Sequence, residues 1–114
     1  MLLIYSMNFK IEAIAAFEKD LKQLSKKYPS LKKDYEDMLY SLLANPQQGE
    51  PLGKDCYKIR MSISSKGQGK SGGARLITNV KVVKEKVYLI AIYDKSEMEN
   101  ISDKELKERL KDIK

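Results

Sequence analysis

The sequence predicts an α+β fold, in which a helical hairpin packs on a twisted antiparallel β-sheet and a short helix follows at the C-terminus. Two observations support this prediction. Before residue 46, apolar residues recur at spacings of three and four, as on one face of an amphipathic helix. Between residues 57 and 93 they alternate with polar residues or form continuous runs, as in strands. A chain of 114 residues has the size of one domain, so we expect a single domain over residues 1–114.

Two helices are expected in the first half of the chain. Residues 14–28 carry one apolar stripe that ends before Pro29, and residues 31–43 carry a second stripe. Ser30 can act as the N-cap of the second helix, and Asn45-Pro46 can stop it. A short first strand could occupy residues 8–12. Met7 is an alternative start, and the apolar residues 1–4 are too few for a signal peptide.

The second half has the period of strands. Residues 57–63 alternate strictly, residues 75–83 are rich in β-branched side chains, and residues 87–93 are nearly all apolar. These three runs predict an antiparallel meander, whereas residues 46–56, with two prolines and two glycines, predict a surface loop. Residues 102–105 fit a capping box at the start of the last helix. By strand parity, the sheet face opposite the helical hairpin should be partly open and carry Lys58, Arg60, Arg75, Asn79 and Lys81.

The excess positive charge is concentrated in one fifth of the chain. The formal net charge is +6, and residues 54–75 alone contain six basic residues and one acidic residue. The remainder of the chain is almost balanced. Such a local excess suggests a binding site for a polyanion, although a solvated, lysine-rich surface is the common alternative.

A loop rich in glycine and lysine is expected between the first two strands of the meander. Residues 64–75 read Ser-Ser-Lys-Gly-Gln-Gly-Lys-Ser-Gly-Gly-Ala-Arg and contain four of the six glycines. Glycines let the backbone approach a ligand closely, and lysines supply counter-charge for a phosphate. The run lacks the four-residue spacer of a nucleotide P-loop and joins two strands, which argues against ATP or GTP binding. A merely flexible hairpin loop is the alternative.

Three stretches of the chain share a pattern with one protein family: residues 55–60, Asp-Cys-Tyr-Lys-Ile-Arg, the loop at residues 66–75, and residues 89–97. Together they resemble the RelE-type toxins of the RelE/ParE superfamily, in which residues 55–60 are similar to the start of the second strand. Residues 66–75 resemble the basic loop of the HigB-like branch, and residues 89–97 are similar to that branch's last strand and the Tyr-x-Lys-x-Glu stretch that follows it. The resemblance implies a RelE-like fold and an mRNA endonuclease that works in the ribosomal A site, with a partner antitoxin covering its active face.

Cleavage of RNA by its own 2′-OH needs a base for the hydroxyl, stabilisation of charge at the phosphorus, and an acid for the leaving oxygen. The chain has no histidine, and its sequence contains no cluster of His, Asp and Glu that suggests a metal. Neighbouring cations depress the pKa of a lysine, so one lysine of the basic segment could act as the base while arginines hold the phosphate. The resemblance implies such a Lys/Arg set, and it carries over most directly to Lys58, Arg60 and Arg75.

Two groups of site residues are therefore expected. The catalytic group consists of Lys58, Arg60, Lys70, Arg75 and Lys95. The RNA-binding group consists of Lys54, Lys66, Tyr93 and Glu97. This sequence departs from the RelE pattern after the last strand, because it lacks the arginine and the stacking tyrosine that the family has there. Tyr93 could therefore be a core residue, and Glu97 could be a general base or could only hold Lys95 in place.

Other functions of the same fold remain possible at this point. A ParE-like toxin would inhibit DNA gyrase without cleaving RNA, and a catalytically silent module would bind RNA or the ribosome through the same basic face. The expected partners are a cognate antitoxin and mRNA on the ribosome, with no membrane and no small-molecule cofactor. We expect a cytoplasmic protein, in which the lone Cys56 is a small core residue and not a nucleophile.

Overall fold

The computed structural model describes residues 9–67, 69 and 71–113. Met7 and Lys70, on which predictions were made above, lie outside these ranges. The elements in chain order are β1 (Lys10–Ala13), α1 (Ala15–Lys27), α2 (Leu31–Ala44), β2 (Glu50–Gly53), β3 (Cys56–Met61), the 3₁₀ turn η2 (Ser64–Lys66), β4 (Ala74–Lys81), β5 (Lys86–Asp94) and α3 (Asp103–Leu110). The α+β class, the helical hairpin, the meander and the C-terminal helix are confirmed.

The sheet has five strands in the order β1-β5-β4-β3-β2. Strands β3, β4 and β5 form the predicted antiparallel meander. The predicted antiparallel sheet is confirmed except at one edge, where β1 pairs with β5 in parallel. The prediction of a loop over residues 46–56 was also wrong in part, because β2 pairs with β3 at the other edge. All four residues of β2 are exposed and one is Pro51, so this edge strand has no apolar alternation by which to recognise it.

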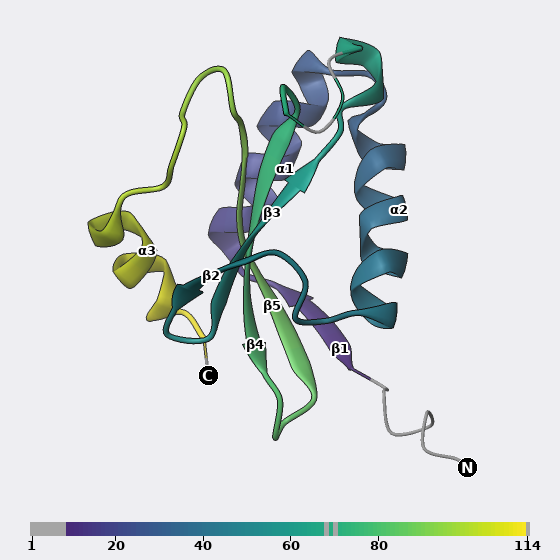
Figure 1. The fold of residues 1–114 in the computed structure, drawn as a ribbon. Helices are drawn as coiled ribbons and strands as arrows, with labels where there is room; N and C mark the ends of the chain where they lie inside the picture. The colour runs from purple at the N-terminus through teal and green to yellow at the C-terminus, as the bar shows by residue number, and fades with distance from the viewer. Residues whose placement is uncertain (1–8, 68, 70, 114) are drawn as a thin grey trace.

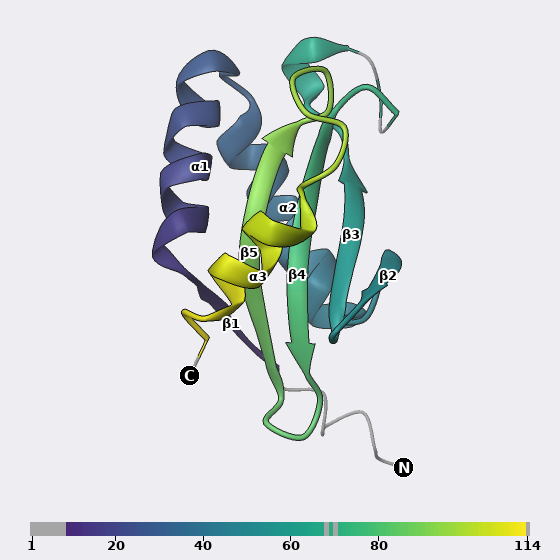
Figure 2. The same ribbon diagram turned by 90° about the vertical axis from the view of Figure 1, so that its left-hand side faces the viewer.

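The three helices lie on opposite sides of the sheet. Helices α1 and α2 cover one face, and α3, with the segment that leads into it, lies across the other (Figures 1 and 2). The main core fills the space between the helical hairpin and the sheet, with Phe17, Leu31 and Leu42 buried against sheet residues such as Leu76 and Leu89. Ser102 is the N-cap of α3 as predicted, since the backbone N–H of Glu105 donates to Ser102 Oγ at 3.1 Å, whereas the Glu105 carboxylate accepts a hydrogen bond from Arg109 Nε at 2.8 Å.

The strand register confirms which residues share the sheet face that carries α3. This face is less open than the sequence predicted. Arg60 lies opposite Arg75, and Cys56 lies opposite Asn79, so these side chains project to one side together with Lys58 and Lys81. Arg75 and Asn79 are nevertheless only 4% and 1% exposed. The segment after β5 folds back over this face, and the β2–β3 turn covers Asn79, whose amide donates to the Lys54 carbonyl oxygen at 2.9 Å.

Cys56 is buried, as predicted for a small core residue, and burial raises the pKa of its thiol. Within the described part of the chain, no helix has both the length and the apolar content that a membrane crossing requires.

Candidate functional site

A small pocket of about 200 Å³ opens on the sheet face that carries α3. Its walls come from β3, the start of β4, the glycine-rich loop and the segment after β5. The lining residues are Lys58, Arg60, Ser71, Arg75, Lys95, Glu99 and Asn100. The pocket therefore brings together four of the five residues predicted to be catalytic, and the fifth, Lys70, lies outside the described ranges.

Two arginines form one wall of the pocket. Arg60 and Arg75 are direct cross-strand neighbours on β3 and β4, and the side chain of Arg60 is exposed. Like charges at directly opposed positions are unfavourable unless a counter-ion lies between them. Two arginines on adjacent strands carry the hydrogen-bond donors and the charge that can bind an anion such as a phosphate.

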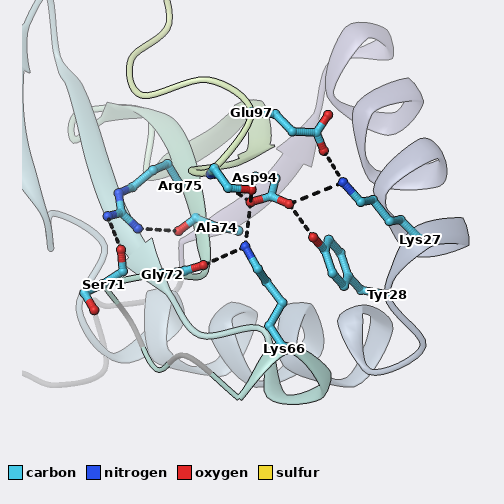
Figure 3. Close-up of polar contacts among 10 residues, drawn as sticks. Lys27, Tyr28, Lys66, Ser71, Gly72, Ala74, Arg75, Asp94 and Glu97 are labelled. Carbon is cyan, nitrogen blue, oxygen red and sulfur yellow. Dashed lines mark hydrogen bonds and ion pairs between the residues drawn. The ribbon is translucent and has the colours of Figure 1, made fainter.

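Arg75 is buried and firmly oriented. Its Nη1 donates to the Ala74 carbonyl oxygen at 3.1 Å, and its Nη2 donates to the Ser71 carbonyl oxygen at 3.2 Å (Figure 3). These two backbone acceptors define the plane of the guanidinium group. The side chain of Arg75 therefore needs little reorganisation when negative charge develops on a ligand beside it. The glycine-rich loop, through Ser71, is thus connected directly to the arginine wall.

Lys58 lies two residues before Arg60 on the same face of β3, and a carboxamide and a carboxylate lie beside its ammonium group. Its Nζ donates to Asn100 Oδ1 at 2.8 Å and lies 3.5 Å from a carboxylate oxygen of Glu50. Glu50 belongs to β2 and pairs with Lys58 in the register. Sequence reasoning missed Glu50 because it missed β2.

The segment after β5 supplies the remaining wall through Lys95, Glu99 and Asn100. Glu97, which was expected in the site, instead forms an ion pair of 2.6 Å with Lys27 of α1. It does not hold Lys95 by any contact that the structure shows. The pocket contains Glu99, two residues further on, which sequence reasoning did not single out. The segment is irregular, so no period tells which of its side chains face the strands.

The other residues of the expected RNA-binding group do not line the pocket, although Tyr93 lies opposite the pocket residue Arg75 in the register of β4 and β5. Lys54 is exposed at the β2–β3 turn, beyond the end of β3 that is farther from Arg60. Tyr93 is 7% exposed and packs in the core, where burial raises the pKa of its hydroxyl. Lys66 forms an ion pair with the buried Asp94 at 2.8 Å, on the side of α1.

The described residues contain no group of three or more His, Cys, Asp or Glu side chains that could hold a metal ion. The lining of the pocket is dominated by cations, with one carboxylate and one carboxamide. Such a lining suits the binding of phosphate and the stabilisation of charge on it.

Comparison with known proteins agrees with this fold. The family described as the RelE toxin of the RelE/RelB toxin–antitoxin system matches residues 40–113. A mutant of the Escherichia coli toxin RelE in the free state is 20% identical, with a TM-score of 0.61 over 94% of this chain and 99% of that one. The isolated E. coli RelE toxin is 22% identical, with a TM-score of 0.55 over 90% and 96% of the two chains. The RelE-like fold is thereby confirmed, and the chain belongs to the RelE family of toxins from toxin–antitoxin systems.

Proposed function

We propose that this RelE-family toxin cleaves mRNA on the ribosome through the pocket formed by Lys58, Arg60, Arg75 and Lys95, without a metal ion. The observation that carries the proposal is the convergence of these four cations on one small pocket of the sheet face. We also propose that the chain belongs to the HigB-like branch, which its basic loop at residues 66–75 resembles. A toxin with this activity works in the cytoplasm, where ribosomes translate.

The chemistry assigns different tasks to the arginines, to Lys58 and to the segment after β5. The 2′-oxygen attacks the adjacent phosphorus, the bond to the 5′-oxygen breaks, and a cyclic phosphate and a 5′-hydroxyl result. Arg60 and Arg75 stabilise the negative charge that develops on the phosphate oxygens. Lys58 donates a hydrogen bond to Asn100 and forms an ion pair with Glu50, so its ammonium group suits protonation of the leaving oxygen. Lys95 and Glu99 are then the candidates for the base that accepts the 2′-OH proton.

Expression of the chain without its antitoxin should arrest growth by stopping translation. The test is induced expression followed by mapping of mRNA 5′ ends, which should reveal new 5′-hydroxyl ends inside coding regions. Arg60→Ala is a suitable inactive control because Arg60 is exposed and its loss should not disturb the fold. Normal growth with folded wild-type protein present would contradict the toxin proposal, and arrested growth with intact mRNA would favour binding without cleavage.

The cognate antitoxin, of the RelB type in this family, should present an acidic or amphipathic segment to the basic pocket face. Charge complementarity at this interface should raise the association rate by about tenfold or more at low salt relative to high salt. Stopped-flow association at several salt concentrations measures this effect. Arg60→Glu should weaken the salt dependence, whereas Lys84→Glu, on the exposed β4–β5 turn, should leave it unchanged. A rate independent of salt would exclude electrostatic steering.

A further inference from the structure

A buried carboxylate lies at the end of β5, behind the pocket. The side chain of Asp94 is only 1% exposed, yet it accepts four hydrogen bonds. The donors are Lys66 Nζ at 2.8 Å, Tyr28 Oη at 2.5 Å, and the backbone N–H and hydroxyl of Ser96 at 2.9 and 2.7 Å (Figure 3). Lys27 Nζ lies 3.7 Å from the same carboxylate. The cluster of Asp94, Lys66, Tyr28 and Ser96 is called the Asp94 cluster below.

The Asp94 cluster holds the glycine-rich loop through Lys66. The same ammonium group that binds Asp94 also donates to the Gly72 carbonyl oxygen at 2.8 Å. Gly73, the next residue, accepts a hydrogen bond from the backbone N–H of Lys95 at 3.1 Å. A Cβ atom at Gly73 would lie 2.1 Å from the Met61 carbonyl oxygen, so the loop can approach β3 this closely only with glycine there. The end of the loop is therefore fixed between β3 and β5.

Two walls of the pocket depend on these contacts. Ser71, which directly precedes Gly72, supplies a carbonyl oxygen that orients the guanidinium group of Arg75. Lys95 lies between Asp94 and Ser96 in the chain, and the Asp94 carboxylate accepts a hydrogen bond from the backbone N–H of Ser96. This bond fixes the backbone on both sides of Lys95. One buried carboxylate thus fixes the backbone on both sides of the pocket, although it lines no part of the pocket itself.

Stability alone does not explain such an arrangement. Transfer of two charges out of water is unfavourable, and well-packed apolar residues often stabilise a fold as well as a buried ion pair does. What an ion pair with several directed hydrogen bonds provides is a defined geometry. Lys66 is 10% exposed and makes two directed bonds to different segments, which determines how those segments lie relative to each other.

We propose that Asp94 and Lys66 are positioning residues that hold Lys95 and the Ser71–Arg75 contact in the arrangement required for RNA cleavage. This inference rests on the proposed function of the pocket. It assigns to Lys66 a role different from the RNA contact expected from the sequence. A displacement of about 1 Å of catalytic groups can cost on the order of a hundredfold in rate, so loss of this support should reduce turnover more than affinity.

The test compares Lys66→Met with a matched control in full-length protein. Lys66→Met keeps the aliphatic stem and removes both directed bonds. The control is Arg109→Met, because Arg109 is comparably buried, forms an ion pair of 2.7 Å with Asp20, and lies outside the pocket lining. Single-turnover cleavage of ribosome-bound mRNA gives the maximal rate and the ribosome concentration at half-maximal rate, and thermal unfolding gives the loss of stability for each variant.

Lys66→Met should lower the maximal rate by about thirtyfold or more, with little change in the half-maximal concentration. Arg109→Met should retain the wild-type rate even if its melting temperature falls as far as that of Lys66→Met. Lys66→Arg, which can still donate to both Asp94 and Gly72, should recover part of the activity. Equal rates for Lys66→Met and Arg109→Met, both measured below their melting temperatures, would overturn the proposal.

Hydrogen exchange gives a second measurement that does not depend on activity. The backbone N–H groups of Lys95 and Ser96 should exchange faster in Lys66→Met than in the wild type, and remain unchanged in Arg109→Met. If the wild type fails to cleave mRNA, the proposed function fails, and the exchange data still decide whether the Asp94 cluster orders these segments. Unchanged exchange at both positions in Lys66→Met would overturn the positioning role.

Discussion

Arg60→Ala should lower the single-turnover rate of mRNA cleavage by about a hundredfold or more, the usual effect of losing one preorganised group that stabilises transition-state charge. Arg60 is exposed, lies opposite Arg75 in the register and lines the pocket, so its guanidinium group can reach a bound phosphate. Affinity for the ribosome should change far less, because many phosphate contacts contribute to it. The measurement is cleavage and binding with the same ribosome-bound mRNA.

Lys84→Ala is the matched control, since it also removes one positive charge but lies on the exposed β4–β5 turn. Its cleavage rate should equal that of the wild type. Arg75→Ala is a less selective test, because Arg75 is buried and its loss would leave two backbone carbonyl groups without this donor. Equal and modest losses of rate and affinity for Arg60→Ala and Lys58→Ala would contradict catalysis and favour a binding module.

Asp94→Ala should lower the free energy of unfolding by about 3–5 kcal/mol at neutral pH, because it leaves the ammonium group of Lys66 buried without its partner. The loss should appear as a lower midpoint in urea denaturation with an unchanged slope. Glu97→Ala provides the comparison within the same segment. The carboxylate of Glu97 is exposed and pairs with Lys27, which is also exposed, so its removal should change the midpoint little.

The effect of Asp94→Ala should also depend on pH. Burial by itself would raise the pKa of the Asp94 carboxyl, but hydrogen bonds from Lys66, Tyr28 and Ser96 outweigh it and hold the pKa far below the usual value. A carboxyl with a depressed pKa in the folded state contributes stability that is fully present above the pKa of the unfolded chain, about 3.9. That contribution is lost as the pH falls toward the folded pKa.

The difference in unfolding free energy between wild type and Asp94→Ala should therefore be constant from pH 7 to about pH 5 and shrink below about pH 4. Urea denaturation at pH 7 and pH 3 measures it. The wild type contains other acid-sensitive contacts, such as Asp34, whose pKa burial would raise but hydrogen bonds from Ser64 lower. These contacts are the same in both proteins, so the comparison isolates Asp94. A difference that grows on acidification would contradict the assignment.

Much of the fold could be predicted because its signals are local. The apolar stripes of α1 and α2, the alternation in β3 and the apolar run of β5 each reflect the geometry of one element. Strand alternation by itself also places Lys58 and Arg60 on one face of β3, since parity within a strand does not depend on its partners. That Arg75 of β4 shares this face depends on the register between the two strands, in which it lies opposite Arg60.

Other features were decided only by the tertiary structure, because they depend on the path of irregular segments and on which strands pair. Strand β1 pairs in parallel with β5, more than 70 residues away, and β2 completes the other edge, although neither has a pattern that specifies its partner. The segment after β5 covers Arg75, turns Glu97 toward Lys27 and leaves Glu99 in the pocket. Lys66 was expected to meet RNA and instead meets Asp94, 28 residues further along. Burial and pairing of charges result from the packing of distant segments, which the charge and period of a single segment do not encode.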